Sequence, residues 1–141
     1  MFWTLYPMPY TIYLPPITGM LLGLIPVINT QNMNWISLQD EQQLRELKEK
    51  SNIRPQVIYK HSVRCGVSSV VKSRLEKAKL PSDMDYYFLD IIHFRSISNK
   101  ISEEFMVYHE SPQVLIIRNG ECVYDESHMG ITAQEIEAQA M

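Results

Sequence analysis

Residues 56–68 read Gln-Val-Ile-Tyr-Lys-His-Ser-Val-Arg-Cys-Gly-Val-Ser, and the fold prediction starts from this stretch. Its first part, Gln56–Lys60, is rich in β-branched and aromatic side chains, which is typical of a strand. A short loop, His61–Arg64, follows, and apolar residues at helical spacing then predict a helix from near Cys65 to Lys79. We expect this helix to turn four apolar residues inward: Val67, Val70, Val71 and Leu75. The stretch therefore predicts a strand that leads directly into a helix, with a cysteine at the junction.

The flanking segments continue this alternation of strands and helices. Before it, the pattern predicts a strand at Asn34–Leu38 and a helix that begins with Asp40 as its N-cap and ends near Lys50. After it, the pattern predicts a strand at Tyr86–Ile92 and then a helix marked by Ile97, Ile101 and Phe105. Two further strands are predicted at Val114–Ile117 and Glu121–Tyr124, joined by the turn Asn119-Gly120. The last predicted element is a helix capped by Thr132. The order β-α-β-α-β-α-β-β-α calls for parallel strands first and an antiparallel hairpin last. We expect an α/β fold, a mixed central β-sheet flanked by helices on both faces.

The composition narrows the class of protein. The chain has 141 residues, 45% of them hydrophobic and 21% charged, which suits one domain with a buried core. Its net charge of −3 argues against bulk attraction to nucleic acid. Two cysteines are too few for a disulfide framework and lack zinc-ligand spacing, so we expect a cytoplasmic protein without a metal site.

The first 32 residues differ from the rest of the chain. No charged side chain precedes Asp40, and prolines stand at positions 7, 9, 15, 16 and 26. The best apolar run, Ile17–Ile28, is shorter than the roughly 20 residues that a membrane span needs, and no basic signal region is present. We expect residues 1–32 to be a disordered extension, or upstream sequence translated before a true start at Met33. A membrane-associating or crude signal segment and an ordered extension are the alternatives, and residues 33–141 form the predicted domain.

Cys65 is the candidate nucleophile. At a helix start its sulfur faces unpaired N–H groups and the positive end of the helix dipole, which favour thiolate over thiol. Arg64 and Lys60 add positive charge nearby in the sequence. A buried structural cysteine is the alternative, but this placement favours a reactive one.

Ser68 stands three residues after Cys65, where a dithiol protein has its second cysteine. A serine cannot form an internal disulfide, so a mixed disulfide at Cys65 would need an outside thiol for its release. Ser68 is able to donate a hydrogen bond to the thiolate, or to bond locally to the backbone.

Ser111-Pro112 precedes a core strand, a good place for a cis peptide bond. A cis bond would expose the backbone of Ser111 to an extended thiol substrate, whereas an ordinary trans proline is the alternative.

Three motifs carry a resemblance to a known family: Lys60–Ser68, His109–Val114 and Asn119–Asp125. With the order of elements, they resemble the monothiol bacilliredoxins of the thioredoxin-like superfamily over residues 33–137. Val63 stands where family members often have Thr, and residues 1–32 have no counterpart there.

The resemblance implies an oxidoreductase that removes bacillithiol from S-bacillithiolated client proteins through a mixed disulfide at Cys65. Bacillithiol is then a co-substrate, and no cofactor is bound tightly. Candidate substrate contacts are Lys60, Arg64, Ser111 and Pro112. His61 and His109 are candidates to tune the thiol or shuttle a proton, although a structural or surface role is the favoured interpretation of each. We expect Cys122 to be structural, or otherwise a slow secondary thiol.

Two other functions stay open on the sequence. Some monothiol proteins of this fold share an iron–sulfur cluster across a dimer through one cysteine and a small thiol. A redox-inert adaptor would use the fold as a docking surface, and Cys65 would then react slowly.

Overall fold

A computed structural model describes residues 33–141, and the expectations for residues 1–32 lie outside the described residues. Strand β2 (Gln56–His61) lies at the centre of a five-stranded sheet with the order β1-β3-β2-β4-β5. β3 (Asp85–Asp90) runs parallel to β2 and to β1 (Ile36–Ser37). β4 (Gln113–Arg118) and β5 (Glu121–Ser127) continue the sheet antiparallel to β2 and to each other, which confirms the mixed sheet.

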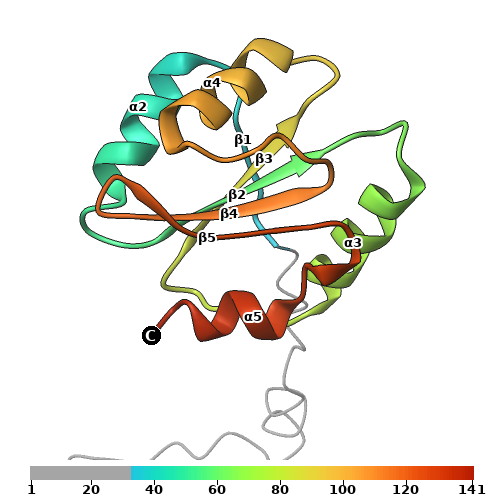
Figure 1. The fold of residues 1–141 in the computed structure, drawn as a ribbon. Helices are drawn as coiled ribbons and strands as arrows, with labels where there is room; N and C mark the ends of the chain where they lie inside the picture. Colours follow the sequence, from blue (N-terminus) through green and yellow to red (C-terminus); the bar gives the residue numbers. More distant parts are fainter. Residues whose placement is uncertain (1–32) are drawn as a thin grey trace, which may run out of the picture. The chain divides into compact units, whose positions relative to one another are not determined.

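Helices cover both faces of this sheet (Figure 1). α2 (Glu41–Lys50) and α4 (Arg95–Phe105) pack on one face, and their apolar residues share a cluster with Ile58 of β2. α3 (Gly66–Lys77) and α5 (Ala133–Ala138) pack on the other, in a second cluster with Val57 and Tyr59. A short 3-10 helix, η1 (His128–Gly130), joins β5 to α5. The predicted α/β architecture is confirmed, since each face of the sheet has its own core.

Every residue of β2 is buried, and its side chains alternate between the two faces. Tyr59 points into the α3/α5 cluster and Ile58 into the α2/α4 cluster. By the same alternation Lys60 lies on the α2/α4 face and His61 on the α3 face. This period of two decides which side chains can reach the cysteine that follows the strand.

Two details of the prediction are wrong. Val67 and Val70 are 38% and 54% exposed, because the buried face of α3 follows Ser68, Val71 and Leu75 instead. The inward position of the first turn is taken by a serine, which sequence patterning treats as polar and therefore outward. The strand expected at Tyr86–Ile92 ends at Asp90, where a turn begins.

Asp40 caps α2 as predicted. Its side chain accepts a hydrogen bond from the backbone N–H of Gln43 at 2.8 Å, and the Gln43 side chain accepts one from the Asp40 N–H. This reciprocal arrangement satisfies N–H groups that an α-helix leaves without partners at its start.

Replacing this cap should destabilise the domain. We expect Asp40→Ala to lower the free energy of unfolding by about 1 kcal/mol, measured by urea denaturation, because N-cap carboxylates contribute about that much. Gln39→Ala, one residue outside the helix, is the matched control and should change stability little. Equal losses in the two variants would contradict a specific capping role.

Candidate active site

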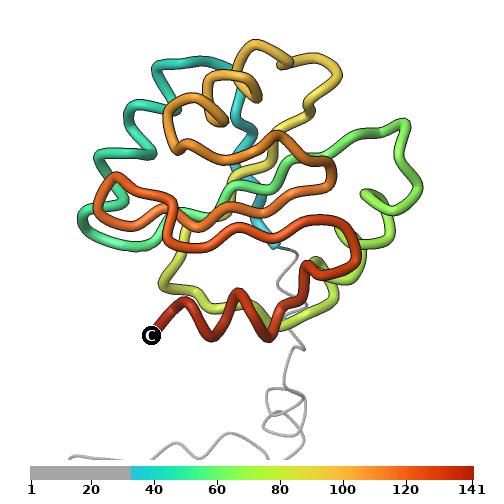
Figure 2. The backbone as a smooth tube through the Cα atoms, in the orientation of Figure 1, coloured from blue at the N-terminus to red at the C-terminus, as the bar shows by residue number. Residues whose placement is uncertain are grey.

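Cys65 is the N-cap residue of α3 and is half-buried. Its backbone N–H donates to the Ser62 carbonyl at 3.1 Å, and its carbonyl accepts from the Ser69 N–H at 3.4 Å. Figure 2 shows the backbone leaving β2, turning, and entering α3. The side chain of Cys65 is thus held at the start of α3, where it makes no capping hydrogen bond to the helix N–H groups.

Ser68 anchors the turn that carries Cys65. Its side chain is fully buried, and its Oγ accepts a hydrogen bond from the backbone N–H of Ser62 at 3.1 Å. The same Oγ lies 2.8 Å from Nδ1 of His61. Among residues 33–141 these are the partners of the Ser68 hydroxyl, and its hydrogen bond to a Cys65 thiolate stays a prediction.

His61 lies under the start of α3, as the alternation along β2 requires. Its ring packs against Phe88, with 5.2 Å between centroids, and is 5% exposed. Burial lowers the pKa of His61, and the positive charge of Lys72 lowers it further. The imidazole is therefore held neutral near neutral pH.

Lys60 lies on the opposite face of the sheet. It is fully buried, and its Nζ donates to Oγ of Ser102 in α4 at 3.3 Å. Burial lowers the pKa of Lys60 to about 8, with repulsion from Arg95 as a second cause. This placement corrects the expectation that Lys60 contacts substrate beside Cys65, because strand alternation turns its side chain toward α4.

His109 and Cys122 also belong to the α4 side. Nδ1 of His109 lies 3.0 Å from Oγ of Ser98, and burial lowers the His109 pKa, followed by the charge of Lys60. Cys122 packs against the α2/α4 core, and burial raises its thiol pKa to about 11. These properties favour a structural role for Cys122, and the contact with Ser98 places His109 beside α4.

Ser111 and Pro112 lie at the same edge of the sheet as Cys65. Lys60 pairs with Gln113 in the antiparallel register, so the two residues before Gln113 extend past the end of β2. The Ser111–Pro112 peptide bond is cis, and the Pro112 carbonyl accepts from the His128 N–H at 2.9 Å. Arg64, next to Cys65, is exposed.

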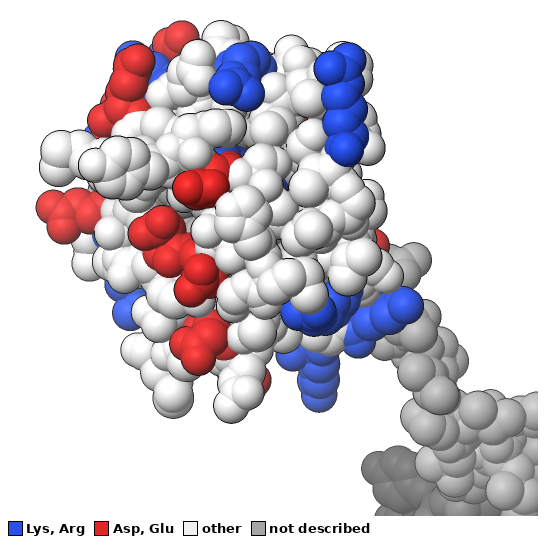
Figure 3. Space-filling model, turned by 45° about the vertical axis from the view of Figure 1, so that its right-hand side comes forward, with Lys and Arg blue, Asp and Glu red and all other residues white. Residues whose placement is uncertain are grey.

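Charged side chains are unevenly spread on this side of the molecule. Figure 3 turns the α3 side of Figure 1 forward; acidic side chains form a column at the left and centre of this view, and most basic side chains lie nearer its edges. Uncharged surface lies between them. An anionic partner would meet the basic and the uncharged parts of this face more favourably than the acidic column.

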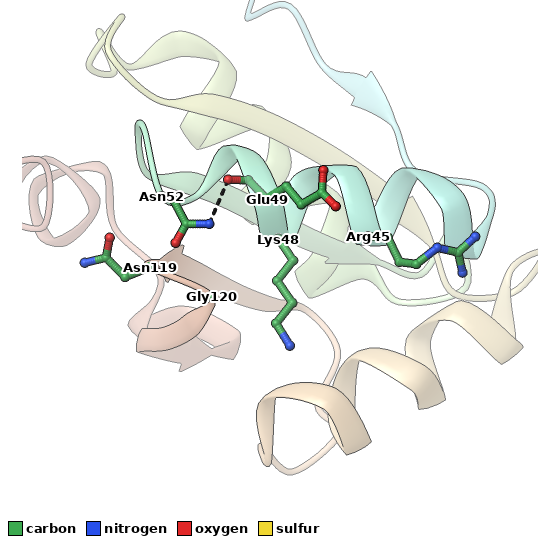
Figure 4. A pocket seen from close by; sticks show the side chains of 6 residues that line it. All are labelled: Arg45, Lys48, Glu49, Asn52, Asn119 and Gly120. Carbon is green, nitrogen blue, oxygen red and sulfur yellow. Dashed lines mark hydrogen bonds between the residues drawn. The ribbon is translucent and has the colours of Figure 1, made fainter.

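A pocket of about 410 Å³ lies at the other end of the sheet (Figure 4). Lys48 and Asn52 of the α2 region face Asn119 and Gly120 of the β4–β5 turn across it. That turn follows the end of β4, whereas Cys65 follows the end of the antiparallel β2. The pocket is therefore separate from the cysteine site.

The comparisons with known proteins agree with this geometry. Residues 36–136 match the family described as monothiol bacilliredoxin BrxC. The chain belongs to the monothiol bacilliredoxin family.

Solved structures extend the agreement to the fold. A protein with a thioredoxin fold is similar at 31% identity and a TM-score of 0.67, covering 79% of this chain and 96% of its own. Thioredoxin from Fasciola hepatica is 18% identical with a TM-score of 0.62, over 74% and 98% of the two chains. Thioredoxin from Schistosoma mansoni is 18% identical with a TM-score of 0.61, over 77% and 94%. The fold of this bacilliredoxin-family chain is thus thioredoxin-like, and family and fold support a redox thiol protein.

Sequence reasoning missed two residues of the bacilliredoxin site. The buried Tyr59 hydroxyl donates to the Ser68 carbonyl at 2.7 Å, and the backbone of Ser62 bonds both Ser68 and Cys65. Tyr59 carried a signal, since a tyrosine in a buried strand needs a partner for its hydroxyl. Nothing in the sequence pointed to Ser62, because its hydrogen bonds to Ser68 and Cys65 are made by its backbone atoms.

Two further features concern the whole domain. In the described part of the chain, no helix is long and apolar enough to cross a membrane. Within the same residues, no group of three or more His, Cys, Asp or Glu side chains could hold a metal ion.

Burial of Lys60 gives a pH-dependent stability prediction. The folded pKa of about 8 lies below the ordinary 10.5, so the unfolded chain binds the proton more tightly between these values. Burying the charged Lys60 ammonium lowers the free energy of unfolding by its full amount below pH 8, and this loss disappears as the pH rises toward 10.5. Lys60→Met should therefore stabilise the domain by up to about 3 kcal/mol at pH 7, and the gain should fade by about pH 10.

Urea unfolding at several pH values tests this prediction. Lys77→Met is the matched control, because Lys77 is exposed near the end of α3. A stability difference for Lys60→Met that is independent of pH would contradict the burial penalty.

Proposed function

We propose that this protein is a monothiol thiol–disulfide oxidoreductase that removes bacillithiol from S-bacillithiolated proteins. The observation that carries the proposal is a half-buried Cys65 at the N-terminus of α3, in a chain of this family. Ser68, three residues on, cannot complete an internal disulfide. The partners are then S-bacillithiolated client proteins and bacillithiol itself, with no tightly bound cofactor.

The proposed reaction has two thiol–disulfide exchanges. The Cys65 thiolate attacks the bacillithiol sulfur of the client mixed disulfide, and the client thiolate leaves and takes a proton. Cys65 and bacillithiol are now joined by a disulfide. The thiolate of a second bacillithiol attacks the bacillithiol sulfur of that bond, which releases Cys65 and forms bacillithiol disulfide. Electrons balance in both steps, because each exchange breaks one S–S bond and forms another.

Cys122 does not suit the resolving step. Its thiol is half-buried on the α2/α4 side, and its raised pKa of about 11 leaves little thiolate at neutral pH. Both cysteines are free, which suits the reducing cytoplasm that we propose as its setting. Release of Cys65 therefore depends on a thiol from outside the chain.

Substrate contacts in this proposal come from the edge that carries Cys65. The exposed guanidinium of Arg64 would attract the carboxylates of bacillithiol. The backbone of Ser111 and the ring of Pro112 would hold the extended part of the bound thiol.

Intact mass spectrometry tests the function. With oxidised bacillithiol, the full chain should gain one adduct that maps to Cys65, and a bacillithiolated client should lose its own. Cys65→Ser should abolish both changes, whereas Cys122→Ser should leave them intact, because its thiol is protonated and half-buried.

An adduct that forms equally on Cys122, or no adduct at all, would contradict the proposal. The visible spectrum of anaerobically purified protein would then test the iron–sulfur alternative.

The role of Arg64 predicts a charge-dependent rate. Arg64→Ala should slow reaction with oxidised bacillithiol about two- to fivefold at low salt, as exposed charge pairs contribute less than about 1 kcal/mol. The difference should shrink as salt is added, because exposed charges are screened. Arg74→Ala, an exposed arginine in the last turn of α3, is the matched control. Equal slowing toward an uncharged disulfide would overturn electrostatic recognition.

A further inference from the structure

The turn between β4 and β5, Asn119-Gly120, has no part in the proposed function. Both residues have positive φ angles, 51° for Asn119 and 77° for Gly120, as a tight hairpin turn requires. Gly120 adopts its angle at no steric cost, and it places no side chain beside its own peptide nitrogen. That nitrogen can therefore approach the side-chain carbonyl carbon of Asn119, Cγ, without hindrance, and a bond between the two atoms closes a five-membered ring.

This ring closure is the first step of asparagine deamidation. The Gly120 nitrogen gives up its proton to hydroxide and bonds to Cγ of Asn119. The side-chain nitrogen leaves as ammonia after taking a proton from water, and a succinimide remains. Water then adds across one of the two ring C–N bonds, which gives aspartate or isoaspartate. The balance is one water consumed and one ammonia released, with no change of oxidation state.

The Asn119 side chain is open to this reaction. It is exposed, and Figure 4 shows its amide turned away from Lys48. None of the other pocket residues drawn there hydrogen-bonds to that amide. Any restraint on the reaction must therefore act on the backbone of the turn.

Ser51, the C-cap residue of α2, holds the backbone of the turn. Its carbonyl accepts from the Asn119 N–H at 2.9 Å, and its Oγ accepts from the Gly120 N–H at 2.8 Å. Ser51 is 1% exposed, and its hydroxyl donates to the Lys48 carbonyl. Because α2 engages the hydroxyl proton, the lone pairs of Oγ are left to accept from Gly120.

We propose that Asn119 is a site of spontaneous deamidation and that Ser51 is the positioning residue that restrains it. The Gly120 nitrogen must lose the proton that Ser51 binds, and it must turn toward the Asn119 side chain. Both requirements break the 2.8 Å hydrogen bond to Ser51. The reaction therefore needs the turn to detach from α2 first.

Either product would change the turn. Aspartate places a carboxylate on the wall of a pocket that Arg45 and Lys48 also line. Isoaspartate also inserts one carbon into the backbone between residue 119 and Gly120. The two N–H groups that bond to Ser51 would then be spaced differently, so both bonds could not be kept. Isoaspartate formation would thus detach the turn from α2.

Mass spectrometry of the full chain, incubated at mildly alkaline pH, tests the restraint. The readout is the mass gain of amide-to-acid conversion in the peptide that contains Asn119, which should give two product isomers. Ser51→Ala should raise the deamidation rate about three- to tenfold, because one hydrogen bond is lost. Asn99, exposed in α4, is the internal reference and should react at an unchanged rate.

Asp40→Ala is the matched control for lost stability. It removes the cap at the other end of α2 and leaves Ser51 in place, so the Asn119 rate should stay at the parent value. The parent protein gives a second measurement that needs no variant. Asn119 should react at least about tenfold more slowly in the native protein than in the urea-unfolded chain, where the turn has lost its hydrogen bonds to Ser51.

Three results would overturn the inference. The first is an unchanged rate in a folded Ser51→Ala variant. The second is an equal rise in Ser51→Ala and Asp40→Ala, which would assign the reaction to global unfolding. The third is a parent protein in which native and urea-unfolded Asn119 react equally fast. None of these measurements involves Cys65 or bacillithiol, so they are independent of the proposed function.

Discussion

The pairing of β2 with parallel β3 on one side and antiparallel β4 on the other fixes where the helices and the cysteine lie. Parallel neighbours need a crossover helix, so the chain must enter α3 as soon as β2 ends. The residues between them necessarily lie at the sheet edge, and the N-terminus of α3 begins there. The antiparallel β4 starts at the same edge, which is why Pro112 and Cys65 share it. The cysteine site is thus a consequence of strand pairing.

The alternation of side chains along β2 then divides the neighbouring polar residues. Lys60 and His61 are adjacent in sequence, yet Lys60 bonds Ser102 of α4 while His61 meets Ser68 of α3. Sequence proximity to Cys65 suggested that both serve the thiol. The period of two in a strand means that only one of them can, because consecutive side chains face opposite layers. Lys60 therefore packs within the α4 layer. The charged side chain next to Cys65 that stays exposed is Arg64.

Local patterns were sufficient to predict the order of elements, the Asp40 cap and the helix start at Cys65, since each depends on residues close in sequence. They failed at Val67 and Val70, because patterning assigns apolar residues to the core and a serine to the surface. Ser68 occupies the core position because Ser62, His61 and Tyr59 satisfy its polar groups. These partners lie outside α3, in β2 and the turn that follows it. The spacing of apolar residues along a helix therefore cannot predict them. The same holds for His109, whose partner Ser98 is fixed by the packing of α4.

Ser68 meets two separate demands at one position. A redox protein that stops at a mixed disulfide needs a residue at this position that cannot attack the bond. The turn before α3 needs a buried acceptor for the Ser62 N–H, since an unpaired buried N–H costs about 1–3 kcal/mol. A cysteine would fail both demands, because it can form a disulfide and its sulfur is a weak acceptor. An alanine would meet the first demand and leave Ser62 and His61 without their partner. Serine is the small residue that is inert toward the disulfide and still holds the turn, so the monothiol character and the local structure have one physical origin.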